Sequence, residues 1–272
     1  MITPRKAREL IQRGTGRGIR IAILDSGIEA GHPALGGLSL RDDVAIVPGG
    51  VQLTVSPGEA HDVYGHGTAV AAIIRAVAPE AEIGSFRVLG ERLDSRTLII
   101  REGVRQALER GYHILNCSFG CGVLQHVLHY KEWVDEAYVQ GVHIVAACNN
   151  FDFTKPEWPA FFSSVITANL TRVTDPLAMY YRPGTLVEFA ARGCDVEVPW
   201  LGATWKKQTG SSYAAPHIAG ILARLLEGSS GLRPLQAKAL LQEIARPWTG
   251  DMLNAVADSP CASADRGTVT SC

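Results

Sequence analysis

Three residues, spread widely along the chain, have the side chains that nucleophilic catalysis with general acid–base help requires. Asp25 follows the apolar run IRIAIL, His66 lies between two glycines in YGHGTA, and Ser212 is the second serine of TGSSYAAPH. A serine hydroxyl is a weak nucleophile at neutral pH and needs a base to accept its proton. A histidine titrates in the right range, and a carboxylate can orient its ring and stabilise the imidazolium. Together, the three side chains could attack a carbonyl carbon.

Each of these motifs also has an ordinary structural explanation when it is taken alone. Asp-Ser-Gly is a common turn sequence, a single histidine can be a hydrogen-bonded core residue, and Gly-Ser-Ser can be part of a linker. Asp25, however, ends a predicted buried strand, and that edge of the sheet is where α/β proteins bind ligands. His66 and Ser212 both stand at the start of predicted helices. Their positions are compatible with a catalytic role, but each signal taken alone is ambiguous.

The segments that would position these residues alternate between strands and helices. Runs rich in β-branched residues predict strands over 19–27, 82–89, 113–120, 142–149 and 163–170. Longer apolar or amphipathic segments predict helices over 4–12, 67–78, 95–111, 126–141, 214–228 and 233–247, with Ser95 as the cap of the third. The alternation predicts one α/β domain with a mostly parallel central β-sheet flanked by helices on both faces. We expect this domain to cover residues 1–257, and the small, polar tail over 258–272 to be mobile.

The composition restricts the possible partners and locations. Of the 272 residues, 46% are hydrophobic and 19% are charged, and the formal net charge is -1 with no basic block. This balance is typical of a globular protein and gives no support for binding to nucleic acid or an acidic membrane. The N-terminal segment is polar and basic, unlike a secretory signal, and no window has the roughly 18 apolar residues of a membrane span. We therefore expect a cytoplasmic protein whose six cysteines are mostly free thiols.

In chain order, the motifs DSG, HGT and GSSYAAPH resemble those of the subtilisin-like serine peptidases, the subtilase family. The segments ILNCSFG and VAACN resemble the N-x-S-x-G and A-A-G-N strands of that family, and the likeness covers roughly residues 14 to 257. It implies a subtilisin-like fold and peptide-bond hydrolysis through an acyl-enzyme on Ser212, with no cofactor. It also places Ser211 in the neutral position before the nucleophile. Local geometry agrees, because Pro216 lacks the N–H that would bond the carbonyl of residue 212 and leaves Ser212 in an open first turn.

The resemblance further implies how a peptide or protein substrate is held. Asn149 matches the family's oxyanion asparagine and would donate its side-chain amide to the developing negative oxygen, with the backbone N–H of the nucleophile as second donor. Asn150 adjoins it and is the less favoured candidate for this role; without that role it is a plain turn asparagine. The substrate would lie along Ser118, Phe119 and Gly120 as an added β-strand, unless that segment is only strand packing.

Several positions depart from the family pattern. Cys148 replaces the glycine of A-A-G-N and either narrows the pocket or exposes activity to thiol oxidation. Glu157, in KPEWPAFF, matches the base of the family's primary pocket, where a carboxylate favours Arg or Lys at P1, the residue before the cut bond. Because this loop differs in length from the family's, an exposed loop glutamate is an equal alternative. The segment that helps secreted subtilisins hold calcium is very short, and Cys117 and Cys121 lack a second pair at zinc-site spacing, so we expect no metal.

These observations predict an active serine endopeptidase, either a broad one or a dedicated processing protease. A peptide macrocyclase would use the same residues but would pass the acyl group to an amine instead of water. A catalytically silent, peptide-binding subtilase is a third alternative. The sequence has no obvious lid insertion that would exclude water, which favours hydrolysis. It leaves the biological substrate and the oligomeric state open.

Overall fold

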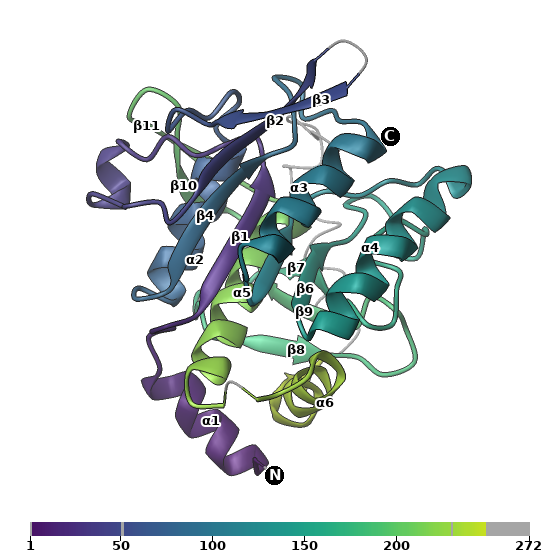
Figure 1. Cartoon of the computed structure of the whole chain (residues 1–272). Coiled ribbons are helices and arrows are strands. Elements are labelled where there is room, and N and C mark those ends of the chain that lie inside the picture. The colour runs from purple at the N-terminus through teal and green to yellow at the C-terminus, as the bar shows by residue number, and fades with distance from the viewer. Residues whose placement is uncertain (1, 50–51, 230, 249–272) are drawn as a thin grey trace.

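A ten-stranded, mostly parallel sheet forms the centre of the protein in the computed structural model, which describes residues 2–49, 52–229 and 231–248 (Figure 1). Across the sheet the strands are β12 (Arg246–Pro247), β8 (Met179–Tyr181), β9 (Phe189–Arg192), β7 (Ile166–Thr171), β6 (His143–Ala147), β5 (Ile114–Cys117), β1 (Arg20–Asp25), β4 (Glu82–Arg87), β2 (Asp43–Gly49) and β3 (Gln52–Pro57). From β9 to β2, every neighbouring pair is parallel, whereas β8 and β3 run antiparallel to their inner neighbours. The predicted fold class is confirmed.

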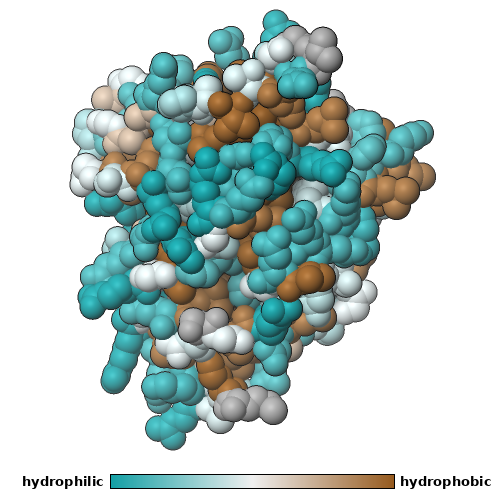
Figure 2. All heavy atoms as spheres, in the orientation of Figure 1, coloured by the Kyte–Doolittle hydropathy of each residue, from teal (hydrophilic) through white to brown (hydrophobic). Residues whose placement is uncertain are grey.

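Helices cover both faces of this sheet. They are α1 (Pro4–Arg13), α2 (His66–Val77), α3 (Thr97–Glu109), α4 (Val127–Gln140), α5 (Ser211–Glu227) and α6 (Pro234–Ile244). One hydrophobic core packs the sheet against α1, α2, α5 and α6, and a second packs it against α3 and α4, which lie in front in Figure 1. In the same orientation, Figure 2 shows a largely hydrophilic surface over the middle of this face, with hydrophobic side chains at its right-hand edge, and Leu128 and Val139 of α4 are exposed.

Strand β1 distributes its side chains between the two cores. Ile21 and Ile23 belong to the core beneath α2 and α5, whereas Ala22 and Leu24 belong to the core beneath α3 and α4. Successive side chains of a strand point to opposite faces, so that Asp25 continues the series of the isoleucines. Its carboxylate is therefore directed to the side of the two helices whose first turns carry the predicted histidine and serine.

A close contact between α2 and α5 brings those first turns to the same edge of the sheet. Gly220, in the middle of α5, faces Val77 near the end of α2. A Cβ atom at residue 220 would lie 2.5 Å from Cγ1 of Val77, a separation that no real side chain tolerates. The glycine is thus needed for the close packing of α5 against α2.

The predicted helix cap at Ser95 is wrong. Helix α3 begins at Thr97 with Arg96 in the cap position and no capping hydrogen bond from that side chain. The hydroxyl of Ser95 instead donates to the backbone oxygen of Val88 at 2.6 Å. This bond ties the loop back to the end of β4 and leaves Ser95 one residue before the cap position.

The sequence pattern missed the strands outside the helix–strand alternation. These are β2, β3, β8, β9, β12 and a separate antiparallel hairpin of β10 (Val196–Trp200) and β11 (Thr204–Gln208). Strand β11 is exposed and carries two lysines, so it lacks the continuous apolar run that marks a buried strand. The hairpin packs against α2 and leads directly into the turn before Ser211.

Among the cysteines of the described part of the chain, Cys117 and Cys148 are buried free thiols and Cys194 is buried, but Cys121 is disulfide-bonded. The prediction was that most cysteines are free thiols, and Cys121 is an exception. In the described ranges, no helix has both the length and the apolar character that crossing a bilayer requires. The tail predicted over 258–272 lies outside the described residues, so the domain boundary at 257 stays a prediction.

Candidate active site

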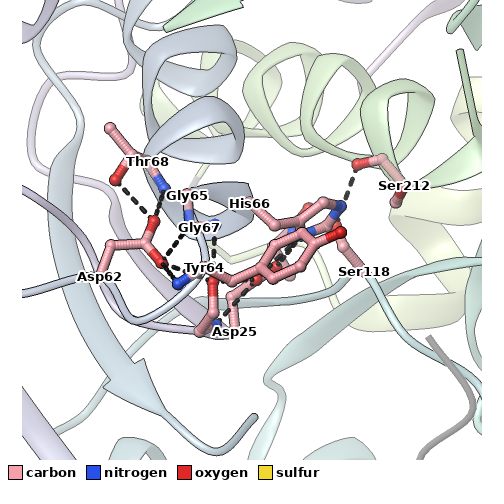
Figure 3. A network of polar contacts seen from close by, with 11 residues as sticks. Asp25, Asp62, Tyr64, Gly65, His66, Gly67, Thr68, Ser118 and Ser212 are labelled. Atoms are coloured by element: carbon pink, nitrogen blue, oxygen red, sulfur yellow. Dashed lines mark hydrogen bonds and ion pairs between the residues drawn. The ribbon is translucent and has the colours of Figure 1, made fainter. Parts of the chain in front are cut away.

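Asp25 and His66 meet at the carboxyl edge of the sheet. Both side chains are almost fully buried, with 1% and 3% of their surface exposed. Nδ1 of His66 lies 2.9 Å from each carboxylate oxygen of Asp25, and Figure 3 shows the imidazole ring between this carboxylate and Ser212. Burial by itself lowers the pKa of His66, but the charge and the hydrogen bond of Asp25 outweigh it, so that the pKa is raised. The arrangement favours an imidazolium.

The glycines on either side of His66 permit its position. Gly65 has φ of 107°, and a Cβ there would lie 2.8 to 3.0 Å from the indole of Trp200. A Cβ on Gly67 would lie 2.0 Å from the backbone oxygen of Gly27, which follows the β1 strand. The start of α2 can therefore approach the end of β1 only because both neighbours lack side chains.

A second buried carboxylate, Asp62, supports the first turn of α2. Its Oδ1 accepts the N–H groups of Tyr64 and Gly65 at 3.0 and 2.7 Å. Its Oδ2 accepts the N–H and the hydroxyl of Thr68 at 2.8 and 2.6 Å. A negative charge at a helix N-terminus satisfies free N–H groups and interacts favourably with the helix dipole. Asp62 therefore fixes the turn that carries His66.

Ser26 links the carboxylates of Asp25 and Asp62, which lie close together in Figure 3. Its hydroxyl lies 2.7 Å from Oδ1 of Asp62 and 3.3 Å from Oδ1 of Asp25, and it accepts the N–H of Gly67 at 3.1 Å. Neither Ser26 nor Asp62 was predicted from the sequence. Asp62 lies three residues before Gly65, the cap position of α2, and the usual pattern of helix starts does not place an acidic residue that far before the cap.

The first turn of α5 presents Ser212 to this pair. Because Pro216 has no N–H, the backbone oxygen of Ser212 lacks its helical partner. The hydroxyl of Ser118 takes that role and donates to this oxygen at 3.1 Å, and Asn116 donates its side-chain amide to the same hydroxyl at 2.9 Å. The residue after strand β5 thus anchors the residue predicted to be the nucleophile. Asn116 was also missed from sequence.

Ser211 has a different environment from Ser212. Its side chain is fully buried, and its hydroxyl donates to the backbone oxygen of Cys148 at 2.6 Å. Its N–H donates to Oδ1 of Asn150 at 2.7 Å. The pair of serines is therefore divided, since Ser211 ties α5 to the end of β6 while Ser212 lies beside the imidazole.

The residues predicted for substrate binding line one pocket next to Ser212. Its walls are formed by Ser118, Phe119, Gly120, Ala147, Cys148, Asn149, Asn150, Glu157, Ser211 and Ser212. The ring of Phe119 is buried in the core beneath α3 and α4, so this residue can offer a substrate only its backbone. Cys148 is likewise almost fully buried, and burial raises the pKa of its thiol.

The side chain of Asn149 is held on both sides. Its Oδ1 accepts the N–H groups of Phe151 and Asp152, each at 2.8 Å, and its Nδ2 donates to Oε1 of Glu157 at 2.6 Å. The amide predicted to stabilise an oxyanion therefore lies in the pocket with its NH2 group directed at a carboxylate. Asn150 uses its side-chain oxygen to hold the N–H of Ser211.

Glu157 reaches the pocket through a backbone contact. Cys121 and Trp158 form an isolated antiparallel bridge, with N–H to oxygen distances of 3.0 and 2.9 Å. This bridge sets the glutamate against Gly120, where a Cβ atom would lie 2.7 Å from Oε2 of Glu157. Burial raises the pKa of Glu157, and the hydrogen bond from Asn149 only partly opposes this.

The geometry can be compared with known proteins. A model described as the Subtilase family matches residues 16–263, which is most of the chain. The chain belongs to the subtilase family. The family and the fold expected from the sequence are thus confirmed.

Within residues 2–49, 52–229 and 231–248, no group of three or more His, Cys, Asp or Glu side chains is placed to hold a metal ion.

Several subtilases are similar over most of this chain. The Minor extracellular protease Epr of Bacillus subtilis (strain 168) is 33% identical over 221 residues, which are 78% of this chain and 32% of that protein. Subtilisin Savinase of Lederbergia lenta is 29% identical over 240 residues, 85% of this chain and 84% of that one. The crystal structure of a cold adapted subtilisin-like serine proteinase has a TM-score of 0.70 at 26% identity and covers 85% of this chain and 83% of its own. This subtilase spans about a third of the first relative.

Proposed function

We propose that this subtilase is an active serine endopeptidase that cleaves peptide bonds through an acyl-enzyme on Ser212. The observation that carries the proposal is the buried contact between the Asp25 carboxylate and Nδ1 of His66, with Ser212 on the far side of the ring. Family membership supports it, and the names of the relatives describe proteases.

Each residue of the triad has a defined role in this mechanism. His66 accepts the proton of the Ser212 hydroxyl through Nε2 as the oxygen attacks the carbonyl carbon of the scissile bond. Asp25 holds the ring in the required tautomer and stabilises the imidazolium, which then gives its proton to the leaving amine. Water, deprotonated by the same histidine, releases the acyl group in the second half of the reaction.

Two donors would stabilise the negative oxygen of the tetrahedral intermediate. The backbone N–H of Ser212 lies at the start of α5, where helix N–H groups are free and the dipole favours negative charge. The side-chain amide of Asn149 lines the same pocket and is the proposed second donor. Loss of one such donor costs about 10²–10³-fold in kcat, the magnitude known for subtilisin.

The substrate side of the proposal follows from the pocket walls. The backbone from Ser118 to Gly120 borders the pocket and would pair with an extended peptide as an added strand. Glu157 lies on the same wall, and a carboxylate there favours Arg or Lys at P1. A dedicated processing role and an intracellular location stay predictions from the sequence.

A fluorophosphonate probe, which reacts with activated serines, tests the core of the proposal. We expect it to label the wild-type chain and the Ser211→Ala variant, and to leave Ser212→Ala unlabelled although that variant is folded. Labelling that depends on Ser211 would overturn the assignment, and an unlabelled wild type would favour the silent, peptide-binding alternative. Product mass separates hydrolysis from cyclisation, because a cyclised product is lighter by one water than the hydrolysed one.

A further inference from the structure

The Glu157 carboxylate is the charged group of the pocket that the proposed reaction does not use. One of its oxygens accepts from the side chain of Asn149 at 2.6 Å, and the other lies against the backbone of Gly120. In the described part of the chain it forms no ion pair with a Lys, Arg or His side chain, whereas many of the surface acidic residues do. A half-buried carboxylate with one hydrogen bond can form an ion pair with a cationic group that enters the pocket.

The partner of this carboxylate is the proposed oxyanion donor. Asn149 cannot turn its NH2 group freely, because its Oδ1 is fixed by the N–H groups of Phe151 and Asp152. The amide therefore keeps its direction, and its NH2 group faces Glu157 when the pocket holds no cation. The NH2 group has two hydrogens, and a negative carboxylate bound to one of them repels the charge that develops beside the other.

We infer that Glu157 couples recognition of the P1 side chain to the oxyanion hole. With an uncharged P1 side chain, the carboxylate stays on the amide of Asn149 and weakens the stabilisation of the oxyanion. A guanidinium or ammonium group at P1 forms an ion pair with the Glu157 carboxylate and neutralises its charge. The side-chain amide of Asn149 then donates to the oxyanion without this opposing charge. A basic P1 side chain is then selected in the chemical step and not only in binding. This inference rests on the proposed peptidase activity.

Matched peptides that differ only in having Arg or Leu at P1 separate this coupling from a simple charge-pairing pocket. For wild type, we expect most of the preference for Arg to appear in kcat. In Glu157→Gln, which has nearly the same shape without the charge, kcat for the Leu peptide should rise by about tenfold and kcat for the Arg peptide should fall. Glu136→Gln, an exposed residue of α4, removes the same charge elsewhere and should change neither value.

A double-mutant cycle decides whether the effect passes through Asn149. In an Asn149→Ala background, the gain of Glu157→Gln on the Leu peptide should vanish, because the donor that it frees is gone. A gain that persists in this background would overturn the inference, as would a Glu157→Gln variant that changes only KM for the Arg peptide.

A soluble cation gives an independent readout that does not depend on the P1 side chain of the substrate. Ethylguanidinium added with a peptide that has Gly at P1 should raise kcat in wild type and have no effect in Glu157→Gln. Inhibition or no effect in wild type would contradict the coupling. If the wild type reacts with the fluorophosphonate probe but shows none of these effects, the inference fails while the peptidase proposal stands; an unreactive wild type defeats the peptidase proposal itself.

Discussion

Replacement of Asp62 by Asn should destabilise the protein much more than the loss of a single charge would suggest. The carboxylate is fully buried and accepts from three N–H groups and two hydroxyls. In asparagine, the amide oxygen can still accept the N–H groups of Tyr64 and Gly65 in place of Oδ1. The NH2 group then replaces Oδ2 and faces the N–H of Thr68, which loses its acceptor. An unsatisfied buried donor costs about 1–3 kcal/mol, and the lost charge at the helix start adds up to about 1 kcal/mol. We expect the free energy of unfolding to fall by about 1–4 kcal/mol.

The same substitution should also change the acid limb of the activity profile. Asp62 contributes to the raised pKa of His66, although less than Asp25 does. Without the Asp62 charge, the imidazolium loses a proton at lower pH. Because only the neutral imidazole accepts the proton of Ser212, the acid limb of kcat/KM should move to lower pH. The movement should be smaller than that caused by removing the Asp25 charge.

Urea unfolding in a Ser212→Ala background, which prevents self-cleavage, measures the first effect, and a pH–rate profile of the active protein measures the second. Asp175→Asn is a matched control, since Asp175 also accepts a backbone N–H but has a side chain that is 49% exposed. It should change the free energy of unfolding by no more than about 0.5 kcal/mol. If Asp62→Asn loses no more than this control and leaves the acid limb in place, Asp62 does not support the catalytic turn as we argue.

Two further substitutions test the supports of the triad from other sides. Ser118→Ala should cost about 1–3 kcal/mol of stability and lower kcat, because the buried backbone oxygen of Ser212 then has no hydrogen-bond donor and Pro216 has no N–H to offer. Thermal unfolding measures the first effect and peptide hydrolysis the second. An unchanged kcat would contradict the role of Ser118. Gly67→Ala should displace His66, because the new Cβ would lie 2.0 Å from the backbone oxygen of Gly27. We expect kcat to fall by about 10²-fold or more while the protein stays folded. Wild-type activity in this variant would show that the clash is relieved without moving His66.

Much of this architecture was predictable because it follows from local pattern. The alternation of predicted strands and helices indicated the parallel sheet. Because the side chains of β1 alternate between the two cores, Asp25 faces the side of α2 and α5. The motifs around Asp25, His66 and Ser212 carried the resemblance to the family. Their meeting at one edge is what parallel strands impose on residues at strand ends and helix starts.

What the sequence did not reveal depends on contacts between distant segments. The hydroxyl of Ser95 was free to cap α3 by its position in the chain, but it bonds the end of β4. Strand β11 carries no apolar period, because its residues are exposed along the strand and it is held by backbone pairing with β10. The contact of Glu157 with Asn149 needs the bridge between Cys121 and Trp158, and no spacing rule specifies which loop will pair with the end of a strand.

Three carboxylates around the site differ in role because they differ in what satisfies them. Asp62 accepts five hydrogen bonds and no ligand could improve its environment, so it is structural. The Asp25 carboxylate accepts hydrogen bonds from His66 and from the N–H of Ser26, and these bonds suit a group that must stay charged while the imidazole gains a proton. Glu157 has a single donor and no cation, so it gains most from a partner that arrives with the substrate. The count of donors at each carboxylate thus separates the group that holds the site from the group that recognises the substrate.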